Sequence, residues 1–283
     1  MNARPQTPLS IDPLLAGVQG FVFDVDGTLA LADKRLSGYQ PLPGAIDVVN
    51  LLRERGVPCS AFTNGTTKTP AELCKALASV GLHFDEQRTL TPVSVAVDHF
   101  RTRGYRRLLV LATEAVYQPL EEAGFEVVRA PQRADDADAV FISWYPDFGL
   151  ADLEAASRAV WGGAAFYTAS TAPFVASREG RTVGISGALS AGVRNVTGRR
   201  AVIVGKPSPA SIRCVVGRLG VPGNALAIVG DDATLELPMA HRAGAVSVAV
   251  HTGLGTAESF AALPPERQPH LSLSGIDQLL ARL

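Results

Sequence analysis

The sequence contains few of the residues that cross-link small secreted domains or bind zinc. Only three of its 283 residues are cysteine, and they are too widely spaced for a disulfide framework or a zinc site. Its five histidines show no metal-ligand spacing such as HExxH. We expect the thiols to be small buried side chains in a reducing compartment, and the histidines to be structural or exposed. These residues are Cys59, Cys74, Cys214, His83, His99, His241, His251 and His270.

Long apolar runs and an excess of charge of one sign are missing as well. No uncharged apolar run reaches the roughly 18 to 20 residues that a membrane-spanning helix needs, and Met1–Gly20 has no apolar core like that of a secretory signal. The formal net charge is −1, the isoelectric point is near 6.5, and Lys and Arg form no long block. We therefore expect a cytoplasmic protein whose partners include neither nucleic acid nor a membrane.

The chain does have a high apolar content, 47%, over a length that suits one large or two ordinary domains. Short apolar segments alternate with helical patterns, and these segments are continuous, as in strands covered on both faces. The alternation predicts an α/β fold with a Rossmann-like, doubly wound parallel sheet. We expect strands at Phe21–Phe23, Val57–Phe62, Ala201–Val204, Leu226–Val229 and Ala245–Val250, and helices at Pro43–Arg55, Pro70–Val80, Pro209–Leu219 and Leu235–Ala243.

The middle of the chain repeats the same alternation over a block of about 100 residues, which is enough for a second domain. We place this block at residues 92–198, which leaves residues 1–91 and 199–283 for the first domain. A Pro-containing loop precedes a short final helix. In the block we expect strands at Arg107–Ala112, Phe125–Val128, Ala139–Ser143 and Ala164–Ala169, and helices at Glu114–Ala123, Leu150–Val160 and Gly187–Val196.

The most informative segment reads Phe-Val-Phe-Asp-Val-Asp-Gly-Thr-Leu and begins at Phe21. Its apolar run delivers Asp24 to the end of a buried strand, with Asp26 two residues later. Two carboxylates this close repel each other unless a cation lies beside them or one stays protonated. Both conditions suit an aspartate that attacks phosphorus beside a second acid that transfers protons. The alternative, a strand followed by an ordinary acidic turn, fits the DxDGT pattern less well.

Thr63, Asn64 and Gly65 follow the second expected strand. A hydroxyl and backbone N–H groups at a strand end can bind the oxygens of a phosphate group. An Asn-Gly turn without a ligand is an equally good interpretation of these three residues taken alone.

Lys206 lies in a Gly-Lys-Pro segment that also follows a buried strand. Its ammonium group can neutralise a nucleophilic carboxylate and a phosphoryl group. The alternative is a surface lysine, the commonest environment of this residue.

Asp231 follows the strand Leu226–Val229. Magnesium binds oxygen ligands and usually takes one or two protein carboxylates, so Asp24 and Asp231 form a candidate magnesium site. Each of the four segments stands at the carboxyl end of an expected parallel strand, which is the edge where open α/β sheets bind ligands.

In their order and spacing, these four segments resemble the motifs of the haloacid dehalogenase (HAD) superfamily of aspartate-nucleophile phosphohydrolases. The resemblance implies a Mg²⁺-dependent phosphatase with Asp24 as nucleophile and Asp26 as general acid and base. Thr63 and Lys206 would assist catalysis and, with Asn64 and Gly65, bind the phosphate group. Asp24, Asp231 and the backbone carbonyl of Asp26 would bind the metal.

The spacing of the motifs also places the inserted domain. The interval from Asp24 to Thr63 is too short for an insertion, whereas the interval from Thr63 to Lys206 contains the whole middle block. This arrangement resembles the class IIA cap branch, which includes para-nitrophenyl phosphatase-like, phosphoglycolate, pyridoxal phosphate, glycerol phosphate and nucleotide phosphatases. The resemblance implies a small phosphorylated metabolite as substrate and makes a homodimer through the cap a possible assembly.

Two other classes of function stay open from the sequence. One is a binding or regulatory protein with the same fold and little turnover, which the intact set Asp24, Asp26, Lys206 and Asp231 argues against. The other is a phosphotransferase with the same nucleophile. A nucleotide-binding Rossmann enzyme has no support, because no GxGxxG follows the first strand.

Some residues near the motifs have no settled role in the sequence. Asp232 can assist catalysis or orient Lys206, and Glu236 stands where many relatives have a second aspartate. Two cap segments are candidates for substrate selection, Trp144–Phe148 and Ala169–Pro173. In the first, Trp144 and Tyr145 suit either stacking on a substrate ring or packing at a strand end.

Overall fold

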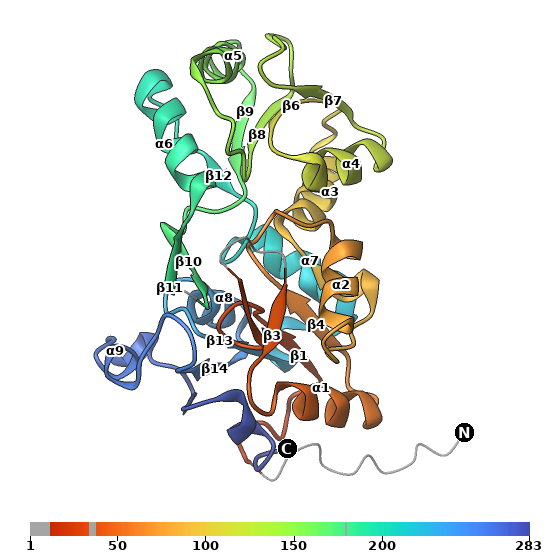
Figure 1. The fold of residues 1–283 in the computed structure, drawn as a ribbon, viewed down its shortest axis with the longest axis vertical. Coiled ribbons are helices and arrows are strands. Elements are labelled where there is room, and N and C mark those ends of the chain that lie inside the picture. The colour runs from red at the N-terminus through yellow and green to blue at the C-terminus, as the bar shows by residue number, and fades with distance from the viewer. Residues whose placement is uncertain (1–11, 34–37, 179) are drawn as a thin grey trace.

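The protein has two α/β lobes, one above the other, in the computed structural model (Figure 1). The structure describes residues 12–33, 38–178 and 180–283. Each lobe is built on its own parallel sheet, so the expected α/β class with a doubly wound parallel sheet is confirmed. We predicted that Met1–Gly20 contains no secretory signal or membrane span. Residues 1–11 of this segment lie outside the described residues.

The lower lobe contains a six-stranded sheet in the order β15-β14-β13-β1-β4-β5, with every neighbouring pair parallel. From β1 the chain builds outward in one direction through β4 and β5, and later in the other through β13, β14 and β15. The order therefore reverses between β1 and β13, and such a switch point opens a crevice at the carboxyl ends of the strands. The strands are β1 (Gly20–Phe23), β4 (Cys59–Phe62), β5 (Thr89–Leu90), β13 (Leu226–Gly230), β14 (Val246–Val250) and β15 (Leu271–Leu273).

Helices cover both faces of this sheet, as the continuous apolar strands require. On one face Phe21 and Phe23 of β1 pack with residues of α1 (Ala45–Glu54) and α2 (Pro70–Ala78). On the other face Val22 packs with residues of α7 (Pro209–Leu219) and α8 (Glu236–Ala243). The remaining short helical segments of this lobe are α9 (Ala257–Ala261) and the 3-10 turns Glu86–Arg88, Gly223–Ala225, Pro265–Arg267 and Ile276–Leu279.

The upper lobe contains a five-stranded parallel sheet in the order β12-β9-β8-β6-β7. Its helices are α4 (Glu114–Glu122), α5 (Leu150–Trp161) and α6 (Ile185–Thr197). We expected Ala201–Val204 as a strand of the first domain, but its strand pairs with β9 and so belongs to the upper sheet. This strand ends at Ile203, beyond residue 198, where we placed the end of the second domain; the domain limits stay a prediction. The strands are β6 (Arg107–Leu111), β7 (Glu126–Arg129), β8 (Ala139–Ile142), β9 (Ala165–Thr168) and β12 (Val202–Ile203).

Helix α3 (Pro92–Arg103), which the sequence interpretation did not include, joins the two lobes (Figure 1). It packs against α4 in the upper lobe and against α7 in the lower lobe. Phe100 is fully buried in a hydrophobic cluster that runs from Val22 and Phe62 of the lower sheet to Leu108 and Phe141 of the upper one. The two lobes therefore share one continuous apolar core along this side.

Two short hairpins lie between the lobes on the side away from α3, and neither was predicted. The hairpin of β2 (Ala30–Ala32) and β3 (Tyr39–Pro41) belongs to the lower lobe, and that of β10 (Phe174–Ser177) and β11 (Gly180–Val183) descends from the upper lobe. The backbone N–H of Arg178 donates to the carbonyl of Ala32, 2.9 Å away, and the Arg178 guanidinium lies 3.5 Å from Asp33. The hairpins thus meet across the crevice.

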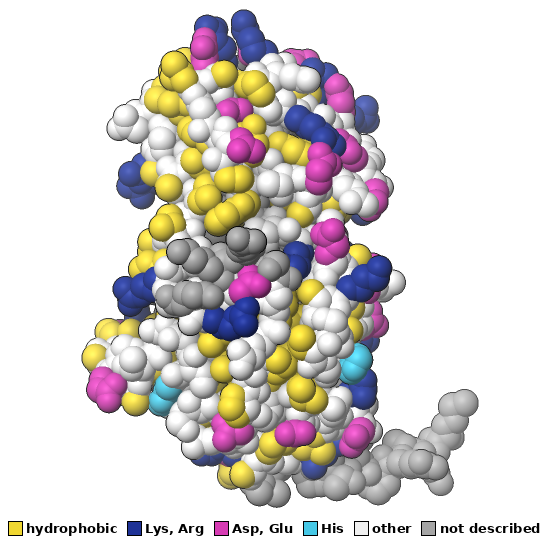
Figure 2. Space-filling view, viewed as in Figure 1, with side chains coloured by type: hydrophobic (Ala, Val, Ile, Leu, Met, Phe, Trp, Pro, Cys, Tyr) yellow, Lys and Arg dark blue, Asp and Glu magenta, His cyan; other side chains and the backbone are white. Residues whose placement is uncertain are grey.

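The expected helices and strands are present with boundaries that differ by a few residues, except that the predicted final helix is the 3-10 turn Ile276–Leu279. Acidic and basic side chains are interspersed on the face shown in Figure 2, with no block of one sign. Within the described part of the chain, no helix has both the length and the apolarity to cross a membrane.

Candidate active site

The first strand delivers Asp24 to the crevice because its neighbours hold it rigidly in the sheet. Phe21 and Phe23 are fully buried and their rings stack with centroids 5.8 Å apart. The N–H of Asp24 continues the pairing with β13 by donating to the carbonyl of Val229 at 2.9 Å. The carboxylate then stands at the strand end, with 8% of the residue exposed.

Gly27 turns the chain away at the crevice, and only glycine fits there. Its φ of +96° lies in the left-handed region that side chains disfavour. A Cβ at this position would also come within 2.5 Å of the Asp231 carboxylate. The glycine of the DxDGT segment therefore permits the first and last motifs to approach each other.

The structure brings the predicted site residues together. One pocket, which we call the reaction pocket, is lined by Asp24, Asp26, Thr63, Asn64, Gly65 and Asp231, with Asp232, Glu236 and Phe174 also on its wall. Lys206 lies just behind it, with its ammonium group paired to the Asp24 carboxylate. Asp24, Thr63 and Asp231 come directly after strands of the lower sheet, as we predicted, whereas Lys206 follows β12 of the upper sheet.

Thr63 and Asp26 are linked side chain to side chain. The Thr63 hydroxyl donates to Oδ2 of Asp26 at 3.2 Å and accepts the N–H of Gly65 at 2.9 Å. The other carboxyl oxygen of Asp26 is buried and has no hydrogen-bond partner among the described residues. Burial and the nearby Asp24 charge raise the pKa of Asp26 to about 7, so this carboxyl exchanges a proton near neutral pH.

Lys206 is almost completely buried, with 1% of the residue exposed, and its charge is held by two acids. Its ammonium pairs with Asp24 and lies 2.7 Å from Oε1 of Glu236. Burial alone would lower the pKa of Lys206, but the two carboxylates outweigh it and raise this pKa above its usual range. The lysine therefore stays charged beside Asp24.

Asn64 uses its side chain to hold the backbone of the lysine loop. Its Oδ1 accepts the N–H of Lys206 at 2.8 Å, while its Nδ2 donates to the Lys206 carbonyl at 3.0 Å and lies 3.4 Å from the Ser170 hydroxyl. In this state the Asn64 amide binds protein rather than substrate. Its predicted contact with a phosphate group stays a prediction.

Glu236, rather than Asp232, orients Lys206. Asp232 Oδ1 accepts from the N–H and the hydroxyl of Thr234, both at 2.7 Å, and so caps its own turn. Glu236 is the first residue of α8, five positions after Asp231, and its second oxygen accepts the N–H of Asp232 at 3.2 Å. The only signal in the sequence was the carboxylate at a position where relatives have aspartate.

The acidic groups around Asp231 match the donors that a hard cation needs. Asp231 accepts the N–H of Leu254 at 2.6 Å, and burial together with Asp24 and Glu236 raises its pKa well above the usual range. No three His, Cys, Asp or Glu side chains in the described part of the chain are grouped to hold a metal alone. Magnesium usually needs only one or two carboxylates, with water and carbonyl oxygen completing its shell. The convergent carboxylates of Asp24 and Asp231, both buried in the same pocket, therefore fit this ion.

A second pocket, which we call the cap pocket, opens from Asp26 toward the upper lobe. Trp144, Ser170 and Ala172 from the two predicted cap segments line it, together with residues 183–186. Tyr145 does not line it, because its hydroxyl lies 3.3 Å from Asp152 and 3.5 Å from the carbonyl of Ala130, inside the upper lobe. Of the two aromatic candidates, only Trp144 reaches the pocket.

Two family models match the chain. One, described as haloacid dehalogenase-like hydrolase, matches residues 21–126, and a second HAD-hydrolase-like model matches residues 203–279. The ribonucleotide monophosphatase NagD of Escherichia coli K12 is 24% identical over 252 residues, which are 87% of this chain and 93% of NagD. The D-glycerol 3-phosphate phosphatase of Mycobacterium tuberculosis is 27% identical over 250 residues, covering 88% of this chain and 67% of that protein.

Solved structures give the same result. The structure of Escherichia coli NagD has a TM-score of 0.81 at 23% identity and covers 92% of this chain and 98% of its own. The glycerol phosphate phosphatase of Mycobacterium tuberculosis in complex with magnesium has a TM-score of 0.79 at 26% identity, covering 92% and 75%. The chain therefore belongs to the haloacid dehalogenase-like hydrolases, in the branch of NagD, and is a phosphoric monoester hydrolase.

Proposed function

We propose that the protein hydrolyses a small phosphate monoester through an aspartyl-phosphate on Asp24, with Mg²⁺ as cofactor. The observation that carries this proposal is the convergence of Asp24, Asp26, Asp231 and Lys206 at the switch point of the sheet. A nucleophile, a proton donor, a cation site and a fixed positive charge stand together there. These are the groups that phosphoryl transfer needs, since its catalysis rests on positioning and charge stabilisation.

The chain's own residues perform the two chemical steps. Asp24 attacks phosphorus while Asp26 gives its proton to the leaving oxygen, and Asp26 then takes a proton from the water that hydrolyses the aspartyl-phosphate. A carboxyl with a pKa of about 7 suits both roles, because it is available in either protonation state near neutral pH. The ammonium of Lys206 offsets negative charge on Asp24 and on the phosphoryl oxygens throughout.

Asp24, Asp231 and the backbone carbonyl of Asp26 would hold the magnesium ion, which when bound offsets charge on the phosphoryl group. The Thr63 hydroxyl and the N–H groups near Asn64 and Gly65 would bind the remaining phosphoryl oxygens. The relatives named as phosphatases support this assignment, and the magnesium complex of the Mycobacterium tuberculosis protein supports the choice of metal.

The test is the Asp24→Asn variant, which keeps the side-chain shape and removes the nucleophile. We expect phosphate release from para-nitrophenyl phosphate with Mg²⁺ to fall by several orders of magnitude, with an unchanged circular dichroism spectrum. The same substitution at Asp47, an exposed residue of α1, is the matched control and should leave activity intact. Turnover that survives in Asp24→Asn overturns the proposal.

The covalent intermediate has its own test. Wild-type protein mixed with substrate and quenched in acid during turnover should carry one phosphoryl group per chain, labile at alkaline pH as an acyl phosphate is. Proteolysis should place this group on the peptide that contains Asp24, and a group found elsewhere contradicts the assignment.

A further inference from the structure

The wall of the cap pocket is apolar with a few hydroxyl groups, unlike the acidic wall of the reaction pocket. It combines apolar side chains, chiefly Trp144 and Ile185, with the hydroxyl groups of Thr67, Ser170 and Ser186. The pocket begins at Asp26, so its contents lie beside the group that protonates the leaving oxygen. The part of a substrate that fills it is therefore the leaving alcohol.

Charged side chains are nearly absent from this wall. Among the described residues that line it, none is Lys, Arg, His or Glu, and Asp26 is the only carboxylic acid. The ammonium of Lys68 lies 5.4 Å from the centre of the Tyr39 ring, and Lys68 is not one of the lining residues. A charged group on the leaving alcohol would thus lose water without gaining an ionic partner among the lining residues.

One feature of the wall, the N-terminus of α6, favours negative charge. Its effect is too weak to offset the burial of an anion. Helix α6 begins at Ile185 with no side-chain cap, and Gly184, Ile185 and Ser186 at its N-terminus line this end of the pocket. A helix N-terminus stabilises a nearby anion only modestly. Burying a carboxylate without a counter-ion costs considerably more free energy than that. The N-terminus can therefore donate to a neutral oxygen but does not offset an anionic group.

The pocket is also small. Its free volume is about 60 Å³, whereas sites for drug-sized ligands span roughly 300–1,000 Å³. The narrow space follows from backbone packing: a Cβ at Gly184 would lie 2.0 Å from the carbonyl oxygen of Ala172. The Gly184–Gly187 segment is thus a tight turn that also forms part of the wall.

We propose that the physiological substrate is the phosphate ester of a small, uncharged alcohol. Its apolar face packs on Trp144 and Ile185, and its hydroxyl or ether oxygens bond to Ser170, Ser186 and the α6 N-terminus. Esters whose leaving group carries a carboxylate, an ammonium or a second phosphate are poor substrates. This inference rests on the proposed function, because it concerns the alcohol that the same reaction releases.

The test compares three two-carbon phosphate esters of nearly equal size. They are 2-hydroxyethyl phosphate, 2-phosphoglycolate and O-phosphoethanolamine, whose far ends are neutral, negative and positive. We expect kcat/KM for the neutral ester to exceed that for each charged ester by at least tenfold. Equal or faster turnover of either charged ester overturns the inference.

Charge placed in the wall should weaken or cancel this preference. Ile185→Lys should raise the ratio of kcat/KM for 2-phosphoglycolate over 2-hydroxyethyl phosphate by about tenfold, the effect of a single nearby charge in a partly screened site. Ile185→Glu should do the same for O-phosphoethanolamine. Val196→Lys, at the exposed far end of α6, adds the same charge outside the pocket and should leave both ratios unchanged.

These results separate two kinds of failure. If no ester and no para-nitrophenyl phosphate is hydrolysed by well-folded protein, the proposed phosphatase function fails. If para-nitrophenyl phosphate is hydrolysed but the two Ile185 variants leave the three-ester ratios unchanged, the function stands and the cap pocket does not contact the leaving group.

Discussion

The ammonium nitrogen of Lys206 lies 2.7 Å from Oε1 of Glu236 and pairs on its other side with Asp24. Both the lysine and the glutamate have only 1% of their surface exposed. The glutamate therefore fixes where the positive charge stands relative to the nucleophile. Because burial, opposed by Lys206, raises the pKa of Glu236 to about 7, its charge is itself sensitive to what surrounds it.

We predict that Glu236→Gln lowers kcat/KM by about 10- to 100-fold, the usual range when a partner of a site residue is removed. The amide keeps the size of the side chain but loses the charge that holds Lys206. We expect the loss mainly in kcat, because Lys206 acts on charge that develops during the reaction. Steady-state kinetics with para-nitrophenyl phosphate measure it.

The matched control is Glu258→Gln, on the exposed face of α9, which should leave kcat and KM unchanged. If Glu236→Gln keeps wild-type kcat, the ion pair has no part in catalysis and serves packing alone.

Gly230 leaves the space that Glu236 occupies. A Cβ at residue 230 would lie 2.0 Å from Cγ of Glu236, which must then move away from Lys206. We predict that Gly230→Ala lowers the free energy of unfolding by about 1–3 kcal/mol through overpacking and lowers kcat in the same direction as Glu236→Gln. Urea denaturation and steady-state kinetics measure the two effects.

Gly217 is the matched control for the Gly→Ala substitution, because it has free space where Gly230 has none. It lies in the exposed interior of α7, and a Cβ there would meet nothing within 4 Å. Gly217→Ala should therefore raise stability by up to about 1 kcal/mol through helix propensity and leave kcat unchanged. Equal effects of the two substitutions would show that Gly230 is not a packing constraint on Glu236.

Asp26→Asn should separate the two chemical steps. Without its acid, the variant can still release nitrophenol, which leaves readily without a proton, but it has no base for the attacking water. We predict a burst of about one nitrophenol per active site, followed by turnover slower than wild type by about 10²- to 10⁴-fold. Stopped-flow absorbance shows both phases, and linear release from the start would exclude slow hydrolysis of an intermediate.

The positions of the site residues could be predicted from the sequence because parallel strands bring their carboxyl ends to one edge. Asp24, Thr63 and Asp231 follow the adjacent strands β1, β4 and β13 of the lower sheet, so strand order alone makes them neighbours. Lys206 follows β12 of the upper sheet, and its place beside Asp24 depends on how the two lobes meet. The direction in which a side chain points after the strand ends could not be predicted in this way, since it depends on local packing. The pairing of Lys206 with Glu236 instead of Asp232 depends on the space over Gly230 and on the Asp232 turn, which no pattern of residue types contains.

Helix α3 escaped prediction for a related reason. Its residues from Pro92 to Val97 are all buried, as is Phe100, because both lobes cover it. This buried first half of the helix shows no polar stripe, and the alternating valines at 93, 95 and 97 are equally typical of a strand. The two hairpins between the lobes are short, so they leave little pattern in the sequence. Their position depends on their contact across the crevice, such as the hydrogen bond between Arg178 and Ala32.

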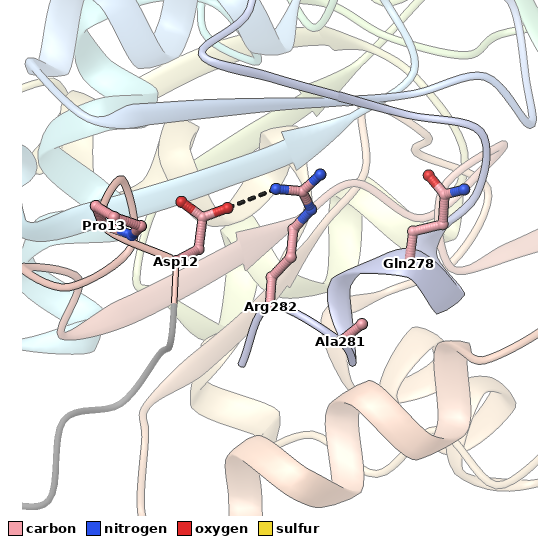
Figure 3. Close-up of a pocket in the computed structure, with 5 residues that line it drawn as sticks. All are labelled: Asp12, Pro13, Gln278, Ala281 and Arg282. Atoms are coloured by element: carbon pink, nitrogen blue, oxygen red, sulfur yellow. Dashed lines mark hydrogen bonds and ion pairs between the residues drawn. The ribbon is translucent and has the colours of Figure 1, made fainter.

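The two ends of the described chain are joined by an ion pair between Asp12 and Arg282, 2.5 Å apart (Figure 3). The N–H of Leu14 and the Arg282 guanidinium lower the pKa of Asp12 below its ordinary value of 3.8. A lowered pKa in the folded protein means that the ionised form stabilises the fold. This contribution is present above the unfolded-state pKa and is lost as pH falls through the folded-state pKa.

We therefore predict that Asp12→Asn lowers the free energy of unfolding at pH 7 by up to about 1 kcal/mol, the range of partly exposed ion pairs. The difference from wild type should shrink below about pH 4, where the aspartate of the wild-type protein also becomes protonated. Urea denaturation at pH 7, 5 and 3 measures it. Arg282→Gln should cause a similar loss at pH 7, and the double variant should lose less than the sum of the two. A difference that persists undiminished at pH 3 would show that the loss does not come from the charge of Asp12, and no difference at pH 7 would show that Asp12 acts through its turn with Leu14, whose acceptor the asparagine retains.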